Sequence, residues 1–278
     1  MNSVAAAVRE EVTTAISKDQ LDLPTLPEVA LNIRDAAEQD DISAAALSQV
    51  IGEDPGLAAR VVKVANSPMY RGTREIETIQ NAVSRLGIEY SSNLATGLAM
   101  QQMFQATSEI IDNKLRDVWS HATQVAAISS VLAKNFTRLK PDQAMLAGLT
   151  HNIGVLPVLS WAEENDNLLN NSLLLDEVIA EIHGDLGELI LRSWDFPAEL
   201  VQVPQHYLDF ERTSEQADYV DVVQVANLQS FAGSDHPWAQ MDWSTVHAFH
   251  QLGLDPGVDA RDIEDISEDM EAAMDMLS

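Results

Sequence analysis

The spacing of apolar residues over residues 110–135 constrains the fold more than any other feature of this sequence. Apolar or small side chains recur there every three or four residues over several turns, which is the period of one face of an α-helix. No segment has the sustained apolar–polar alternation of a half-buried strand. The sequence therefore predicts an all-α protein, with His121 beside the buried face of its longest helix. That face consists of Leu115, Val118, Trp119, Ala122, Val125, Ala126, Ser129 and Leu132.

Local signals predict where several helices begin and end. Asp54 is suited to cap a helix whose first position is Pro55, and Thr78 is suited to cap the next one. Gly87 suits the end of that second helix. Apolar faces are expected at Leu57, Val61, Val64 and Ala65, then at Ala82, Val83 and Leu86. Further helices are expected through Leu94 and Leu98 to about Phe104, from Pro141 to near Gly154, and at about 173–182, 185–194, 197–209 and 214–231.

The acidic tail from Gly253 is expected to form an amphipathic helix that docks on the body, with disorder as the alternative. Apolar residues repeat along it at helical spacing, namely Ile263, Ile266, Met270, Ala273 and Leu277. An internal boundary is expected near residues 105–112, between two helical blocks.

Composition limits the class of protein. With 278 residues, 46% of them hydrophobic, the chain can bury one large core or two modest ones. It has no cysteine, which removes disulfides, thiolate metal sites and cysteine nucleophiles. No apolar run reaches the ~18 residues of a membrane helix, and the N-terminus is too charged for a signal peptide. We therefore expect a cytoplasmic protein.

The charge balance argues against two kinds of partner. The sequence has 44 acidic and 16 basic residues, a formal net charge of −28. Such a surface repels nucleic acid and anionic membranes. The acidity is explained either by solubility or a saline habitat, or by a basic protein partner.

Several segments of the N-terminal half form a recognisable series, namely residues 23–30 (LPTLPEVA), 53–57 (EDPGL), 64–67 (VANS) with Tyr70, 79–83 (IQNAV) and Leu86-Gly87. In this order and spacing they resemble the HDOD domain, a family related to the HD hydrolases. The resemblance implies an HDOD domain over 20–255, with an N-terminal helical lobe at 20–105 and a degenerate HD-like lobe at 110–255. Residues 1–19 would be an N-terminal helix or arm, and 256–278 an acidic C-terminal helix or tail.

A second series of segments lies in the C-terminal half, namely residues 119–121 (WSH), 147–154 (AGLTHNIG), 183–187 (HGDLG), 194–197 (WDFP) and 205–206 (QH). These segments resemble the HD and HD-GYP core. In active relatives, the resemblance implies that His121, His151 and aspartates at positions 152 and 227 hold the metal. This chain has Asn152 and Asn227 at those positions, Val155 where a phosphate-contacting lysine is expected, and no Gly-Tyr-Pro sequence.

Two interpretations of this region stay open. Histidines alone could bind a soft transition metal, or they could persist as a hydrogen-bonded polar core in which asparagine supplies both donor and acceptor. We favour the second and predict no catalytic residue, no metal and no cofactor. The vestigial pocket would comprise His121, His151, Asn152, His183, His206 and Asn227.

Two other groups have weaker signals. His236, His247 and His250 are expected to be surface histidines. The family-signature surface, made by Asp54, Pro55, Asn66 and Ser67, is either a partner or ligand surface or a set of helix caps and loop contacts. We favour the mechanical interpretation of that surface.

The sequence favours a non-catalytic bacterial signal-transduction module that acts through protein–protein or ligand binding, with an unidentified protein partner. The alternative is a residual metal-dependent phosphohydrolase acting on nucleotides or cyclic dinucleotides. A sensor that binds a nucleotide in the former active-site cleft ranks third, because the negative charge and the missing lysine disfavour anions.

Overall fold

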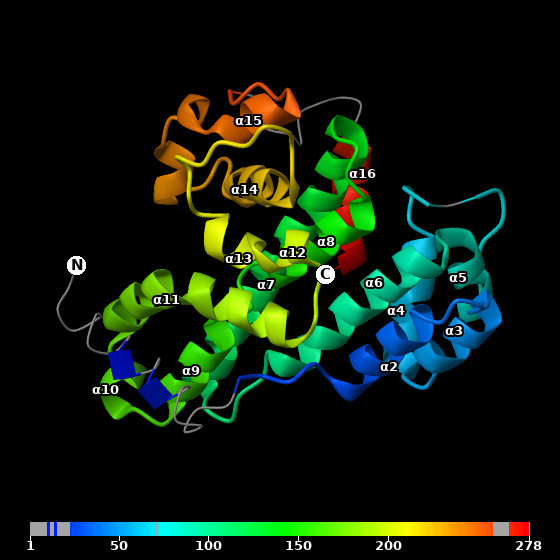
Figure 1. The fold of residues 1–278 in the computed structure, drawn as a ribbon, viewed down its shortest axis with the longest axis horizontal. Coiled ribbons are helices and arrows are strands. Elements are labelled where there is room, and N and C mark those ends of the chain that lie inside the picture. Colours follow the sequence, from blue (N-terminus) through cyan, green and yellow to red (C-terminus); the bar gives the residue numbers. More distant parts are fainter. Residues whose placement is uncertain (1–9, 12–13, 16–22, 71, 258–266, 278) are drawn as a thin grey trace.

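The computed structural model describes residues 10–11, 14–15, 23–70, 72–257 and 267–277, and it confirms the predicted all-α class (Figure 1). No strand occurs among these described residues. The N-terminal half contains α2 (Glu28–Ala37), α3 (Ala44–Gly52), α4 (Pro55–Ala65), α5 (Ile79–Leu86) and α6 (Ile88–Ala99), followed by a 3₁₀ turn (Met100–Met103).

The C-terminal half is built around α7 (Glu109–Phe136), the longest helix described. It continues with α8 (Pro141–Thr150), α9 (Val155–Glu163), α10 (Asp166–Leu169), α11 (Ser172–Ser193), α12 (Ala198–Val201), α13 (Val203–His206) and α14 (Tyr219–Ser230). Two 3₁₀ turns (Pro237–Gln240 and Trp243–Thr245), α15 (His247–Leu252) and α16 (Ser267–Leu277) complete it.

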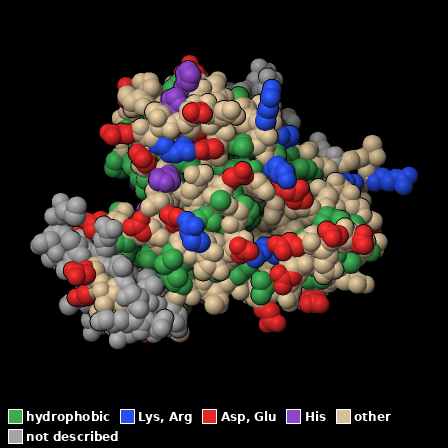
Figure 2. Space-filling view, in the orientation of Figure 1, with side chains coloured by type: hydrophobic (Ala, Val, Ile, Leu, Met, Phe, Trp, Pro, Cys, Tyr) green, Lys and Arg blue, Asp and Glu red, His purple; other side chains and the backbone are tan. Residues whose placement is uncertain are grey.

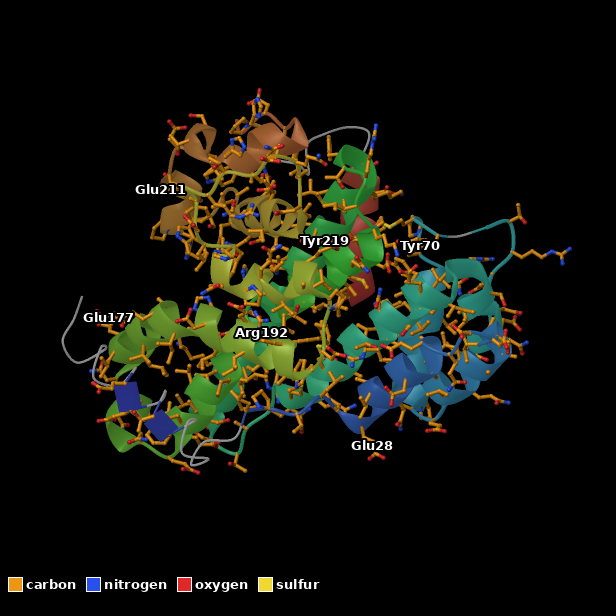
Figure 3. All side chains as sticks on the ribbon, viewed as in Figure 1. Glu28, Tyr70, Glu177, Arg192, Glu211 and Tyr219 are labelled. Atoms are coloured by element: carbon orange, nitrogen blue, oxygen red, sulfur yellow. The ribbon has the colours of Figure 1, made fainter. Side chains whose placement is uncertain are left out.

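The packing joins the two halves through α6. This helix contacts α2 in the first half and α8 in the second, while α8, α14 and α16 all pack on α7 (Figure 1). The buried apolar residues of both halves form one continuous cluster. At the start of α14, Tyr219 faces α8, and its hydroxyl donates to Gln143 Oε1 at 2.7 Å (Figure 3). The domain boundaries given above stay predictions.

The predicted helix caps of the N-terminal half are confirmed. Asp54 accepts a hydrogen bond from the Leu57 amide at 3.0 Å, and α4 begins at Pro55. Thr78 caps α5 by accepting from the Asn81 amide. Gly87 ends α5 with φ +89, a conformation that glycine adopts without strain. The two capping side chains bond amides three residues away, and Gly87 acts through its own backbone, so the sequence was sufficient to identify all three.

The helix predictions of the C-terminal half need correction. His151 and Asn152 do not lie on the last turn of a helix ending near Gly154, because α8 ends at Thr150 and residues 151–154 form a turn. The helix α9 begins directly after this turn and was not expected. The two helices expected at 173–182 and 185–194 are one helix, α11. The single helix expected at 197–209 is two short ones, α12 and α13, and the one expected at 214–231 is α14, residues 219–230.

The end of the chain packs as a helix on the body. In α16, Met270, Ala273 and Leu277 are buried, and the helix contacts α7 and α4. Its Asp269 forms an ion pair with Lys134 of α7 at 2.7 Å. Ile263 and Ile266, also expected on this face, lie outside the described residues, as does most of the arm expected at 1–19.

The outer surface carries acidic side chains over much of the face in view, with basic ones interspersed (Figure 2). Within the described residues, one helical stretch (Pro141–Glu163) is long and apolar enough to cross a membrane by length and composition alone. Its most apolar window is 89% buried inside the protein. That stretch comprises α8, the turn and α9, and core packing accounts for its hydropathy.

Candidate functional site: a histidine and asparagine pocket

Five of the six residues predicted for the vestigial pocket line a single cavity of about 510 Å³. His121 comes from α7, His151 and Asn152 from the turn between α8 and α9, His183 from α11, and Asn227 from α14. Because α7 packs on α8 and α14, side chains more than one hundred residues apart meet here. The sixth residue, at position 206, is described below.

His151 is the most deeply buried histidine of the pocket. Its side chain is fully buried, and Nδ1 lies 2.6 Å from the carbonyl oxygen of Gly148. A carbonyl can only accept, so Nδ1 carries the proton and Nε2 is left as an acceptor. Burial, followed by the neighbouring His121, lowers the pKa of His151 to about 3. The imidazole is therefore neutral at physiological pH.

His183 is held in the same tautomer and is joined to Tyr207. Its Nδ1 donates to the carbonyl oxygen of Ile179 at 2.7 Å, and the Tyr207 hydroxyl donates to Nε2 at 2.9 Å. The Tyr207 ring lies edge-on to His151 and to His183, with centroid distances of 4.7 Å and 5.7 Å. Burial lowers the pKa of His183 and raises that of Tyr207. The phenol thus occupies the lone pair that His183 would offer to a metal.

His121 pairs with the asparagine that replaces an expected aspartate. Its Nε2 lies 2.9 Å from Asn227 Oδ1, so the imidazole donates in the tautomer that carries the proton on Nε2. Its ring packs against Phe231 at a centroid distance of 5.0 Å and lies 5.5 Å from the ring of His151. Burial lowers the pKa of His121, and the bond to Asn227 opposes that effect. This histidine is therefore also neutral.

Asn152 and Val155 complete the turn side of the cavity. The Nδ2 group of Asn152 donates to the carbonyl oxygen of Val118 at 3.3 Å, and its Oδ1 has no hydrogen-bond partner. Val155, which stands where a phosphate-contacting lysine was expected, begins α9 and lines the pocket with an apolar surface. Lys114 lines the mouth of the pocket and is paired with Asp176.

The remaining predicted site residues lie elsewhere. His206 does not line the cavity, and its carbonyl oxygen accepts a hydrogen bond from Gln224 at 3.2 Å. His247 and His250 stack on each other in α15, with ring centroids 5.7 Å apart. Asn66 bonds both backbone groups of Ile76, as the mechanical interpretation of the family-signature surface requires.

Sequence reasoning missed four aromatic residues of the pocket. Tyr207 follows His206 directly and replaces it in the lining. His236 was expected at the surface, yet it is half-buried and stacks on Phe231 at 4.0 Å with 19° between the rings. Trp238 meets Phe231 edge-on at 5.4 Å. The density of aromatic residues after α14 was the available signal for Phe231, His236 and Trp238.

The residues present do not fit the divalent metal of an HD hydrolase. Across the described part of the chain, no group of three or more His, Asp or Glu side chains is placed to hold a cation. The two carboxylate positions are amides, which bring no negative charge to offset a cation. His183 Nε2 is bonded to the Tyr207 hydroxyl, and the Tyr207 ring packs edge-on against both His183 and His151.

Comparison with known proteins identifies the family of this fold. A family model described as the HDOD domain matches residues 23–209. An uncharacterized protein of Treponema pallidum (strain Nichols) is 23% identical over 246 residues, which cover 82% of this chain and 46% of the relative. The chain thus spans about half the length of that curated relative.

Solved structures share the fold along almost the whole chain. A Shewanella amazonensis protein, provisionally named a metal-dependent phosphohydrolase, is 27% identical with a TM-score of 0.88, covering 99% of this chain and 100% of that one. An HDOD domain protein of unknown function from Geobacter sulfurreducens is 21% identical with a TM-score of 0.67, covering 98% and 99%. A Marinobacter aquaeolei protein, provisionally named a signal transduction protein, is 24% identical with a TM-score of 0.66, covering 98% and 65%.

Proposed function

The chain belongs to the HDOD domain family, and from this membership we propose that it is a non-catalytic signal-transduction module. It acts by binding a small ligand or a protein partner and presenting a surface to another protein. The partner is not identified by the sequence or the fold, because one fold serves many functions. The acidic surface disfavours nucleic acid and anionic membranes as partners, and a cytoplasmic location is part of the proposal.

One observation carries this proposal: the hydrogen bonds of the pocket are those of neutral groups. His121 is bonded to Asn227, and His183 to Tyr207. A hydrolytic metal centre needs ligands with free lone pairs and anionic oxygen close to the cation. The pocket offers one free histidine lone pair, on His151 Nε2, beside amides and a tyrosine that carry no negative charge, and Val155 supplies no charge for a phosphate.

The test measures bound metal and phosphoester hydrolysis on the purified chain. The protein is incubated with Mn²⁺, Fe²⁺, Zn²⁺ or Ni²⁺, dialysed, and analysed by inductively coupled plasma mass spectrometry. We expect metal far below one equivalent per chain and no metal-dependent hydrolysis of nucleotides or cyclic dinucleotides. Stoichiometric metal together with hydrolysis that disappears in His151→Ala would instead establish the alternative, a metal-dependent phosphohydrolase.

Restoring the carboxylates provides the positive control. The double variant Asn152→Asp/Asn227→Asp returns both expected acids to the pocket and should bind more metal than the wild type. The matched control is Asn135→Asp/Asn165→Asp, which adds the same two charges at the end of α7 and after α9, outside the pocket. Equal metal gain in both double variants would show that added charge alone, and not the pocket, binds the cation.

A further inference from the structure

A second cavity, of about 670 Å³, lies between the two halves of the chain. Its lining comes from the end of α2 and from α6 on one side, and from α8, α12 and the link before α12 on the other (Figure 1). We call it the α2–α12 cleft. It shares no lining residue with the histidine and asparagine pocket, so it is a separate site.

Hydrogen bonds between the two halves hold the walls of the cleft in place. Arg34 of α2 donates from Nη1 to the carbonyl oxygen of Trp194 at 2.5 Å, and the Trp194 indole donates to the carbonyl oxygen of Pro24 at 3.0 Å. The Arg34 guanidinium also lies over the Phe196 ring, 5.5 Å from its centroid. The cleft is therefore formed before anything binds, which lowers the entropic cost of occupying it.

The floor of the cleft is apolar. Its side chains come from both halves, namely Ile88, Leu146, Phe196 and Leu200. The last three are buried, and Ile88 is half-buried against the core. Apolar side chains of a bound molecule would leave water here, and the cavity volume falls in the range of ligand sites.

The rim of the cleft is acidic. Glu38, Glu89 and Asp195 are exposed and come from three separate segments of the chain. Arg34 is the one lysine or arginine among the described lining residues, and its Nε lies 3.9 Å from Glu38 Oε1. Lys140, outside the lining, is paired with Glu89. Three acids against one base leave the lining with an excess of negative charge.

Polar side chains of the lining offer hydrogen bonds that a bound molecule can reach. Asn93 donates to the Asp142 carboxylate at 2.6 Å through Nδ2, which leaves Oδ1 as an acceptor. Gln143 accepts from the Tyr219 hydroxyl at 2.7 Å through Oε1, which leaves Nε2 as a donor. Ser92 is 4% exposed, and its hydroxyl bonds no described residue. None of these three atoms is fully enclosed, and a peptide backbone supplies the N–H and C=O groups that they can bond.

The charge of the rim distinguishes between the possible occupants. A second copy of this chain brings a formal net charge of −28, and the tail from Gly253 is itself acidic, so both are repelled. A nucleotide or another anion meets the same repulsion. A basic segment that also carries apolar side chains gains twice, because its cations meet the acidic rim while its apolar side chains cover the floor.

We propose that the α2–α12 cleft binds a basic peptide segment of a protein partner, in which lysine or arginine side chains flank apolar ones. The apolar side chains of the segment pack on Ile88 and Leu146, and its cations pair with Glu38 and Asp195. The inference rests on the proposed function, because a module without catalysis signals by binding such a partner.

Selection from a displayed library of random eight-residue peptides tests the proposal on the full chain. Three forms are used in parallel: the wild type, the rim variant Glu38→Gln/Asp195→Asn and the matched control Glu211→Gln/Asp235→Asn. Each double variant neutralises one glutamate and one aspartate, and the control positions are exposed and outside the cleft. Asparagine tolerates the left-handed backbone of Asp195, which has φ +56, so the rim variant should keep the fold.

We expect the wild type and the control to enrich peptides that combine lysine or arginine with apolar residues. A synthetic peptide of the enriched sequence, followed by fluorescence anisotropy, should bind once per chain. It should bind the rim variant about fivefold more weakly or worse, because two exposed ion pairs are lost. Replacing either its basic or its apolar residues by serine should weaken binding to the wild type, a result that does not depend on the folding of any variant.

Three results would overturn the proposal. They are no enriched peptide on the wild type, enriched peptides without basic residues, and equal affinity of the enriched peptide for all three forms. The last would show attraction to the acidic surface at large. Each leaves the non-catalytic proposal standing if the wild type still lacks metal-dependent hydrolysis. Hydrolysis that depends on metal and His151 would instead refute the non-catalytic proposal itself.

Discussion

Gly154 is the last residue of the turn that carries His151 and Asn152. Its replacement by alanine tests whether the backbone of this turn packs directly against the backbone of α11. A Cβ atom at this position would lie 1.9 Å from the carbonyl oxygen of His183 and 2.5 Å from the amide nitrogen of Gly187. Both of these atoms are backbone atoms in the middle of a helix. Neither can move away by a change of rotamer.

The free-energy cost follows from the displacement that alanine requires. Ordinary contact of a Cβ begins near 3.4 Å, so the turn and α11 must separate by about 1.5 Å. Gly154 has φ −66 and ψ −6, which alanine adopts freely, so backbone strain contributes nothing. Overpacking a buried contact costs roughly 1–3 kcal/mol, and a clash between two backbones belongs at the upper end. We expect Gly154→Ala to lower the free energy of unfolding by about 3 kcal/mol.

Urea denaturation followed by circular dichroism measures this change, with Gly52→Ala as the matched control. A Cβ at Gly52, the last residue of α3, would have nothing within 4 Å. Alanine is the better helix former by up to about 1 kcal/mol, so the control should be neutral or stabilised. An unfolding free energy of Gly154→Ala within about 0.5 kcal/mol of the wild type would refute the close approach of this turn to α11.

Three further predictions concern stability. The imidazole of His151 in the unfolded chain, with its ordinary pKa of 6.5, is protonated at pH 5, whereas the folded one, with a pKa of about 3, is not. The contribution of His151 to the free energy of unfolding is therefore complete above pH 6.5 and declines as pH falls toward 3, by about 2 kcal/mol between pH 7 and pH 5. Urea titrations at both pH values should show a smaller decline in His151→Gln. Asp54→Ala removes the cap on the Leu57 amide and should cost about 1 kcal/mol, and full stability in a melting experiment would contradict this. Asn66→Ala removes two hydrogen bonds to Ile76, at 2.7 Å and 2.8 Å, and should cost about 2 kcal/mol, checked by urea titration against the same change at the exposed Asn135.

The parts of the fold that the sequence predicts are those fixed by local chemistry. Asp54 and Thr78 cap their helices through amides three residues away, and Gly87 ends α5 through its own φ angle. The helix α9 was not predicted, because its sequence carries no such local signal. Five consecutive residues from Val155 to Leu159 are buried, so the segment has no polar face and no 3.6-residue period to detect. Pro157 also resembles a helix breaker, although it lies in the first turn, where proline is tolerated.

The pocket was predictable only to the extent that its residues follow a known pattern. The positions of His151, Asn152 and His183 carried the resemblance, and the fold brings them together. Tyr207 lines the pocket in the place expected for His206, and which of these two neighbours points inward depends on how α13 packs against α11 and α14. Likewise, α11 runs through Gly184 without a break. Glycine is needed there for close packing and not for a helix end, because a Cβ would lie only 3.0 Å from the carbonyl oxygen of Pro204.

The amides and the neutral histidines of the pocket are consistent with each other on energetic grounds. Two aspartates at positions 152 and 227 would be buried carboxylates, and without a cation they would have to be protonated or leave the fold destabilised. Asparagine removes that charge and keeps an oxygen for His121 to bond. Burial in turn lowers the pKa of His121, His151 and His183, so no cationic imidazole awaits an anion. Hydrogen bonds between neutral groups, from His121 to Asn227 and from Tyr207 to His183, therefore hold together the positions at which a metal enzyme would need charged ligands.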